Sequence, residues 1–258
     1  MKKLLSIGWL RAGGQALVAQ WSATIYVSLV SLGLTVVLAR SLGPADFGVY
    51  SVVFTVASMW GIVQDGGFKT LLFRETASAS PNLVATLPEV VRGAMFHFLV
   101  TSVLGIAVVA VFPLTHSMET LAGLVCFGAL TVTNFASSLL KGHGEFVREA
   151  AWQCLVRTAS AGGAFLALAC GFKATGVILL AMGLATAAVL VLPHARPVLV
   201  RPFPVRHKSV YTSCLSFIAV DAATMIGASL IAENIGANRI LSVTQSGGSV
   251  AKMWRFRP

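Results

Sequence analysis

The stretch AGGQALVAQWSATIYVSLVSLGLTVVLA, residues 12–39, contains no charged side chain and lies between Arg11 and Arg40. It is longer than the roughly 20 apolar residues that a helix needs to cross a bilayer. Several more apolar runs follow, and they are continuous, whereas a transmembrane barrel would require strict alternation. The sequence therefore predicts an all-α integral membrane protein.

Composition supports this fold class. The chain is 56% hydrophobic and 11% charged, whereas a soluble domain carries about 25% charged residues. Its net charge of +10 is spread through short loops rather than gathered in a patch with aromatic side chains, so we expect no nucleic-acid partner. The four cysteines lie in apolar runs without metal-ligand spacing, and we expect no disulfide, metal or cofactor.

The apolar runs predict six to seven transmembrane helices, with boundaries good to a few residues. They are placed near residues 16–38, 47–64, 93–112, 121–140, 150–171, 174–192 and 210–231. The small residues Gly162 and Gly163 would let helices pack closely. Trp152 is expected near a membrane interface as an aromatic anchor.

The positions of Lys and Arg predict the orientation, because these residues accumulate in cytoplasmic loops. If the N-terminus is cytoplasmic, the outer loops before the last helix carry only Arg40 and Lys173. The inner segments then carry Lys2, Lys3, Arg11, Lys69, Arg74, Arg92, Lys141, Arg148, Arg196, Arg201, Arg206 and Lys208. We therefore predict a multi-pass protein with a cytoplasmic N-terminus.

Four parts are expected along the chain. Residues 1–193 form a six-helix lobe, and 194–208, which is basic and rich in proline, form a cytoplasmic linker. Residues 209–231 form the seventh helix, which Asp221 interrupts. Residues 232–258 lose the apolar pattern and carry four cations on the side that should be outside. This tail is interpreted as the end of a truncated or frame-shifted chain.

Two stretches carry a family resemblance. Residues 38–77, LARSLGPADFGVYSVVFTVASMWGIVQDGGFKTLLFRETA, resemble the polysaccharide biosynthesis proteins, which include the O-antigen and exopolysaccharide flippases of the multidrug/oligosaccharidyl-lipid/polysaccharide exporter superfamily. Residues 139–159, LLKGHGEFVREAAWQCLVRTA, resemble the same family more weakly. The resemblance implies the N-terminal lobe of a two-lobe flippase in the bacterial inner membrane.

The function that the resemblance implies is translocation of an isoprenoid-diphosphate-linked oligosaccharide by alternating access, without enzymatic chemistry. The implied partners are this lipid-linked substrate, membrane lipids and polysaccharide polymerases. Three alternatives stay open: a drug or cation antiporter of the same superfamily, a polytopic membrane glycosyltransferase or polymerase, and an inactive truncated half. An antiporter would require acids within the membrane, and an enzyme would require larger loops or clustered loop carboxylates.

Arginines are the candidate substrate-binding residues, because a guanidinium offers paired donors that suit a diphosphate. Arg157 lies about 10 Å into its predicted helix, where it either faces a cavity or extends to the cytoplasmic interface. Arg40 and Arg74 complete the predicted set. Solvated charge at a helix end is the alternative for Arg40.

Carboxylates are the candidate ion-coupling residues. Asp221 lies in the middle of the predicted seventh helix, where a charge is costly and usually functional; the alternative is that this segment does not cross the membrane. Asp65 is expected to pair with Lys69 or Arg74 near the inner face, or to be a solvated helix-end charge. His97 is expected to be a hydrogen-bonded interface residue rather than a proton relay.

Overall fold

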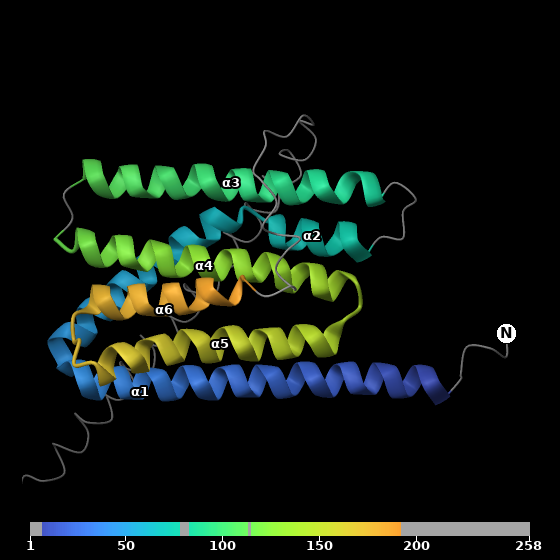
Figure 1. Cartoon of the computed structure of the whole chain (residues 1–258), viewed down its shortest axis with the longest axis horizontal. Coiled ribbons are helices and arrows are strands. Elements are labelled where there is room, and N and C mark those ends of the chain that lie inside the picture. Colours follow the sequence, from blue (N-terminus) through green and yellow to red (C-terminus); the bar gives the residue numbers. More distant parts are fainter. Residues whose placement is uncertain (1–6, 78–82, 113–114, 192–258) are drawn as a thin grey trace, which may run out of the picture.

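The computed structural model describes residues 7–77, 83–112 and 115–191, and every regular element in these ranges is a helix. The helices lie side by side as a bundle (Figure 1). They are α1 (Ile7–Asp65), α2 (Phe68–Ala77), α3 (Leu83–Val111), α4 (Ser117–Gly142), α5 (Phe146–Ala169) and α6 (Thr175–Val189). The predicted all-α membrane fold is confirmed. The predicted linker, seventh helix and tail lie outside the described residues.

Helix α1 is two helices joined at a sharp break. Gly43 has φ 78° and ψ 174°, a conformation that residues with a side chain rarely adopt, and Pro44 begins the second half. Beyond the break the chain leaves the axis of the first half and leads toward α2 (Figure 1). The predicted helices 16–38 and 47–64 are therefore the two halves of α1.

Helix α2 was not predicted from the sequence. It follows a turn in which Gly66 and Gly67 both have positive φ. Its buried residues are Phe68, Leu71, Leu72 and Thr76, the spacing of one helix face. Charged residues on the other face lower its mean hydropathy, so a search for long apolar runs passes over it.

The two central apolar helices differ in surroundings. In the most apolar 18-residue stretch of α4, 72% is buried inside the bundle, whereas in the corresponding stretch of α3 only 22% is buried. Helix α4 contacts each of the other five helices. Three helices in the described residues, Gly14–Asp65, Leu87–Val111 and Ser117–Gly142, are long and apolar enough to cross a membrane. The exposed apolar side chains of α1 and α3 are the surface expected toward lipid.

Close helix approach at glycines explains how α6 packs against α5 and α4. A Cβ on Gly163 would lie 2.4 Å from the carbonyl oxygen of Ala181, and a Cβ on Gly183 would lie 2.9 Å from Cys126 Cα. A Cβ on Gly162 would meet no atom within 4 Å. Gly163 thus has the packing role that the sequence predicted, and Gly162 faces open space.

The position of Trp152 differs from the one predicted from the sequence. Its side chain is 4% exposed in a core with Phe68 and Phe135, and its indole N–H donates to the carbonyl oxygen of Thr133 at 3.1 Å. It is a core residue rather than an aromatic anchor at an interface, because the first turns of α5 pack against α4.

Candidate functional site

A row of polar side chains runs along the contact between α1, α4 and α5 inside this largely apolar bundle. On α5 the polar residues Glu149, Gln153 and Arg157 recur every four residues and so share one face. Hydrogen bonds link this face to residues of α1 and α4 more than ten positions away in the chain. We call the following set the polar seam: Gln20, Ser31, Ser137, Lys141, Glu149, Gln153 and Arg157.

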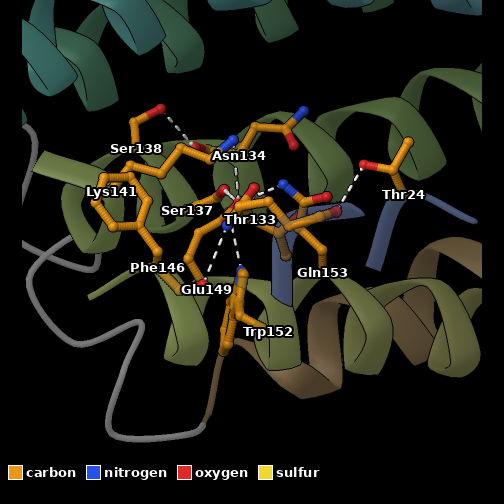
Figure 2. A network of polar contacts seen from close by, with 11 residues as sticks. Thr24, Thr133, Asn134, Ser137, Ser138, Lys141, Phe146, Glu149, Trp152 and Gln153 are labelled. Carbon is orange, nitrogen blue, oxygen red and sulfur yellow. Dashed lines mark hydrogen bonds and ion pairs between the residues drawn. The ribbon is translucent and has the colours of Figure 1, made fainter. Parts of the chain in front are cut away.

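Glu149 is the centre of the seam (Figure 2). Its side chain is fully buried, and Lys141 Nζ lies 3.2 Å from Oε1. Ser137 Oγ donates to Oε1 at 2.6 Å, and Gln20 Nε2 donates to Oε2 at 2.5 Å. The side-chain amide of Gln153 also donates to Oε1. One carboxylate therefore ties α1, α4 and α5 together.

The number of donors around Glu149 has a physical reason. A buried carboxylate is costly unless it is paired and hydrogen-bonded. Glu149 receives one cation and three neutral donors, which together compensate the loss of water. Lys141 keeps 35% of its side chain exposed, so the ion pair reaches the surface at the cation only.

Arg157 lies between two cavities. Its side chain is half-buried, and Nε donates to Ser31 Oγ of α1 at 2.8 Å. One cavity, of about 200 Å³, is lined by Arg157 together with Asn134, Ser137 and Gln153; we call it the Asn134 cavity. The other, of about 310 Å³, is lined by Arg157 with Tyr50 and is called the Tyr50 cavity. Arg157 is thus part of both walls.

The walls of the two cavities mix polar and apolar side chains from different helices. In the Tyr50 cavity, Ser31 and Thr35 come from the first half of α1, and Ser51 and Thr55 from the second half. The Asn134 cavity is walled by α4 and α5, with Val27 of α1. The break at Gly43 therefore brings both halves of α1 to one cavity.

The other predicted arginines lie elsewhere. Arg40 is exposed, three residues before the break in α1, and Arg74 lies on α2 with 55% of its side chain exposed. Arg74 Nη2 lies 3.2 Å from Glu75 Oε1. Neither residue is among those lining the Asn134 or Tyr50 cavity. The three arginines predicted to bind substrate do not converge: Arg157 lines both cavities, whereas Arg40 on α1 and Arg74 on α2 are exposed and line neither.

Asp65 ends α1 and accepts a hydrogen bond from the backbone N–H of Lys69 at 3.3 Å. This contact caps the start of α2, which fits a helix-end role. Asp221 lies outside the described residues. His97 Nε2 lies 2.9 Å from the carbonyl oxygen of Val63, as expected for a hydrogen-bonded histidine. Within the described ranges, no three His, Cys, Asp or Glu residues are grouped as metal ligands.

Comparison with protein families decides the family. The model of the family described as polysaccharide biosynthesis protein matches residues 17–238, which is most of the chain. The chain belongs to the polysaccharide biosynthesis protein family. The match includes the polar seam and the predicted seventh helix. No curated protein and no solved structure matches.

Family membership together with the long apolar helices gives this polysaccharide biosynthesis protein a membrane location and a role in polysaccharide synthesis or export. Within that role, the polar seam is the candidate site. It is the place where charged and amide side chains of three helices meet beside cavities.

Sequence reasoning missed Glu149 in this family member. The predicted helix began at residue 150, so Glu149 was left in a loop beside Arg148. The structure begins α5 at Phe146 and buries Glu149 in its first turn. The four-residue spacing of Glu149, Gln153 and Arg157 was a usable signal, since a polar stripe on a membrane helix faces protein or a cavity.

Proposed function

We propose that this protein translocates a lipid-linked oligosaccharide across the bacterial inner membrane by alternating access, and that it acts as a transporter rather than as an enzyme. The observation that carries the proposal is the position of Arg157 between the Asn134 and Tyr50 cavities. The substrate's diphosphate would bind this guanidinium, which presents paired donors to phosphate oxygens.

The physical requirement for such transport is a polar path beside an apolar surface. A sugar headgroup cannot enter hydrocarbon unaided, whereas its isoprenoid tail can stay in the bilayer. The polar seam supplies hydroxyl, amide and guanidinium groups, and the exposed faces of α1 and α3 are apolar. We further propose a cytoplasmic N-terminus, on the distribution of Lys and Arg.

An antiporter of drugs or cations is the second candidate, and Glu149 is the observation that favours it. An antiporter requires a carboxylate beside its transport path, and Glu149, which is buried in the first turn of α5, is a candidate in addition to the predicted Asp221. Glu149 is already paired with Lys141 at 3.2 Å, however, and Arg157 lies two turns further along the same face. A cationic substrate would meet repulsion there, so we prefer the anionic lipid-linked substrate.

Short connections support a transporter over a glycosyltransferase or polymerase. The segments that join α3 to α4, α4 to α5 and α5 to α6 are residues 112–116, 143–145 and 170–174. A lipid-dependent enzyme needs catalytic groups in the aqueous phase near the membrane. These three connections are too short to form such a domain.

The proposal is tested by genetic complementation. The wild-type chain is expected to restore surface polysaccharide in a strain that lacks its own flippase, and Arg157→Gln to lower the restored amount at least about tenfold, since a hydrogen bond to a charged group contributes about 1.5–3 kcal/mol. Arg148→Gln is the matched control, because Arg148 is exposed and pairs with nearby Glu145 on the surface. Failure of the wild-type chain, or equal activity of the Arg157 variant, would contradict the proposal.

A further inference from the structure

Glu149 determines which atoms of its neighbours remain free for a ligand. An ionised carboxylate accepts hydrogen bonds and donates none. Every group that contacts it must therefore turn a hydrogen toward it, and Lys141, Gln20, Ser137 and Gln153 do so. Glu149 thereby fixes the orientation of these groups and leaves the oxygens of Ser137 and Gln153 as acceptors.

Gln153 shows the consequence most clearly. Its amide nitrogen is directed at Glu149. The amide oxygen sits on the same carbon and points away from the carboxylate. Because Glu149 cannot donate, the reverse orientation of the amide would set two acceptors against each other. Gln153 lines the Asn134 cavity, where its carbonyl oxygen is held away from Glu149 as an acceptor and the second hydrogen of its amide remains a donor.

Two hydroxyl groups of the same cavity also donate their hydrogens to protein acceptors. Ser137 gives its hydrogen to Glu149, and Thr133 gives its hydrogen to the carbonyl oxygen of Leu130 at 2.8 Å. Each hydroxyl has one hydrogen only, so both oxygens retain acceptor capacity alone. We call Thr133, Ser137 and Gln153 the acceptor wall.

The charged donor of the cavity is Arg157, which lies one turn beyond Gln153 on α5, and the amides of Asn134 and Gln153 add neutral donors. A guanidinium has five N–H groups and no acceptor, and the Nε–H of Arg157 is directed at Ser31. The Asn134 cavity therefore combines an anion-binding group with neutral oxygens that require a hydrogen from the ligand. Its volume of about 200 Å³ exceeds several times the roughly 30 Å³ of one water.

We propose that the acceptor wall is a subsite for hydroxyl groups of the sugar next to the diphosphate, and that Glu149 is the positioning residue that creates it. This inference rests on the proposed function, since it assumes that a diphosphate binds Arg157. Phosphate oxygens carry no hydrogen for the oxygens of the wall, and a free cation would be repelled by Arg157. A polyhydroxyl group joined to an anion satisfies both parts of the cavity.

The test compares two kinds of lipid probe on the purified full chain in detergent. One is farnesyl diphosphate, and the others are farnesyl diphosphates that carry a single glucose, galactose or N-acetylglucosamine. The measured quantity is the ratio of the Kd for the bare diphosphate to the Kd for the best sugar-bearing probe. This ratio isolates the contribution of the sugar from that of the diphosphate.

We expect a ratio clearly above one for the wild type. Gln153→Met keeps the shape but removes the acceptor, and it should lower the ratio about five- to tenfold while the Kd for bare diphosphate changes less than about twofold. Glu149→Gln should lower the ratio in the same direction, because the new amide can donate as well as accept and no longer fixes the orientation of Gln153. Glu145→Gln is the control on the exposed start of α5 and should leave both values unchanged.

The outcomes separate this inference from the proposed function. A wild-type ratio of one, or a ratio that Gln153→Met leaves intact, would overturn the acceptor wall. An equal loss of both affinities in Glu149→Gln would show that Glu149 only supports the fold. If Arg157→Gln binds bare diphosphate as tightly as the wild type, the proposed function fails instead.

Discussion

Helices α3 and α5 show opposite relations between hydropathy and function. The most apolar window of α3 has a mean hydropathy of 2.3, yet only 22% of it is buried in the bundle. Helix α5 does not meet the criterion of a long apolar span, yet it carries Glu149, Gln153 and Arg157. The strongest hydropathy signal marks the surface toward lipid, because a helix that faces lipid must be apolar on its outer side.

The comparison also explains where polar residues can be placed. On α5 they are arranged every four residues, so they all meet α1 and α4 and none has to face lipid. The Glu149 carboxylate is fully buried and paired, whereas the Arg148 and Glu145 side chains at the start of the same helix are 64% and 38% exposed. Neighbouring charges on α5 therefore differ greatly in what their removal should cost.

The largest effect is expected from Lys141→Met, which removes the cation beside Glu149. The carboxylate stays fully buried without its charge partner, so the free energy of unfolding in detergent should fall by about 3–5 kcal/mol. Arg148→Gln breaks an exposed pair and should cost less than about 1 kcal/mol. Equal stability of the two variants would mean that the seam is no more sensitive than the surface.

A charge placed on the lipid-facing side of α3 tests the other half of the comparison. Val103 is 59% exposed in the bundle, in the apolar part of this helix. Val103→Arg should reduce membrane insertion by about 2.5–3.5 kcal/mol, the cost of an arginine near the centre of a membrane helix. The membrane-inserted fraction, with Val103→Leu as the control, measures this cost. Unchanged insertion would show that this face of α3 is not in contact with lipid.

Two adjacent glycines on α5 provide a finer test. Gly163→Ala would place a Cβ against the backbone of α6 and should destabilise the protein by about 1–3 kcal/mol. Gly162→Ala meets open space and should be neutral or stabilising by up to about 1 kcal/mol, since alanine favours the helix. Thermal unfolding of the two variants decides, and a reversed order would contradict the close packing of α5 and α6.

The prediction with the smallest expected effect on the protein concerns the labelling of its cysteines. Cys170 is exposed just after α5, whereas Cys126 is buried in α4. With Cys214 replaced by serine, a membrane-impermeant maleimide added to intact cells should label Cys170 and leave Cys126 unlabelled. Loss of the signal in Cys170→Ser provides the control. Labelling of Cys170 only after the membrane is broken would reverse the proposed orientation.

Much of the fold was predictable from local sequence. Continuous apolar runs predicted six of the helices that the structure describes, with α1 counted as its two halves. Most boundaries are shifted by a few residues, and the starts of α1 and α3 by about ten. Helix α2 was not found, because its buried face is only one side of a short and charged segment. The buried position of Trp152 was not found either, because an aromatic residue near a helix end suits a core and an interface equally.

The candidate site was predictable only in part. Arg157 was identified from the sequence because an arginine inside an apolar run is costly wherever the helix packs. Its partner Ser31 lies 126 positions earlier and carries no signal by itself. The predicted group of Arg40, Arg74 and Arg157 is separated in space, since a family motif gives the order of residues along the chain and not their distances.

The sequence by itself determined that this is a helical membrane protein. Each segment that crosses hydrocarbon must be apolar and must satisfy its own backbone hydrogen bonds, and this requirement is visible in one segment at a time. Only the tertiary structure decided that Glu149 is the centre of a polar seam, because its burial requires α1 and α4 to close around the first turn of α5. Hydropathy is a property of one helix, whereas the acceptors left beside Arg157 depend on donors contributed by three helices.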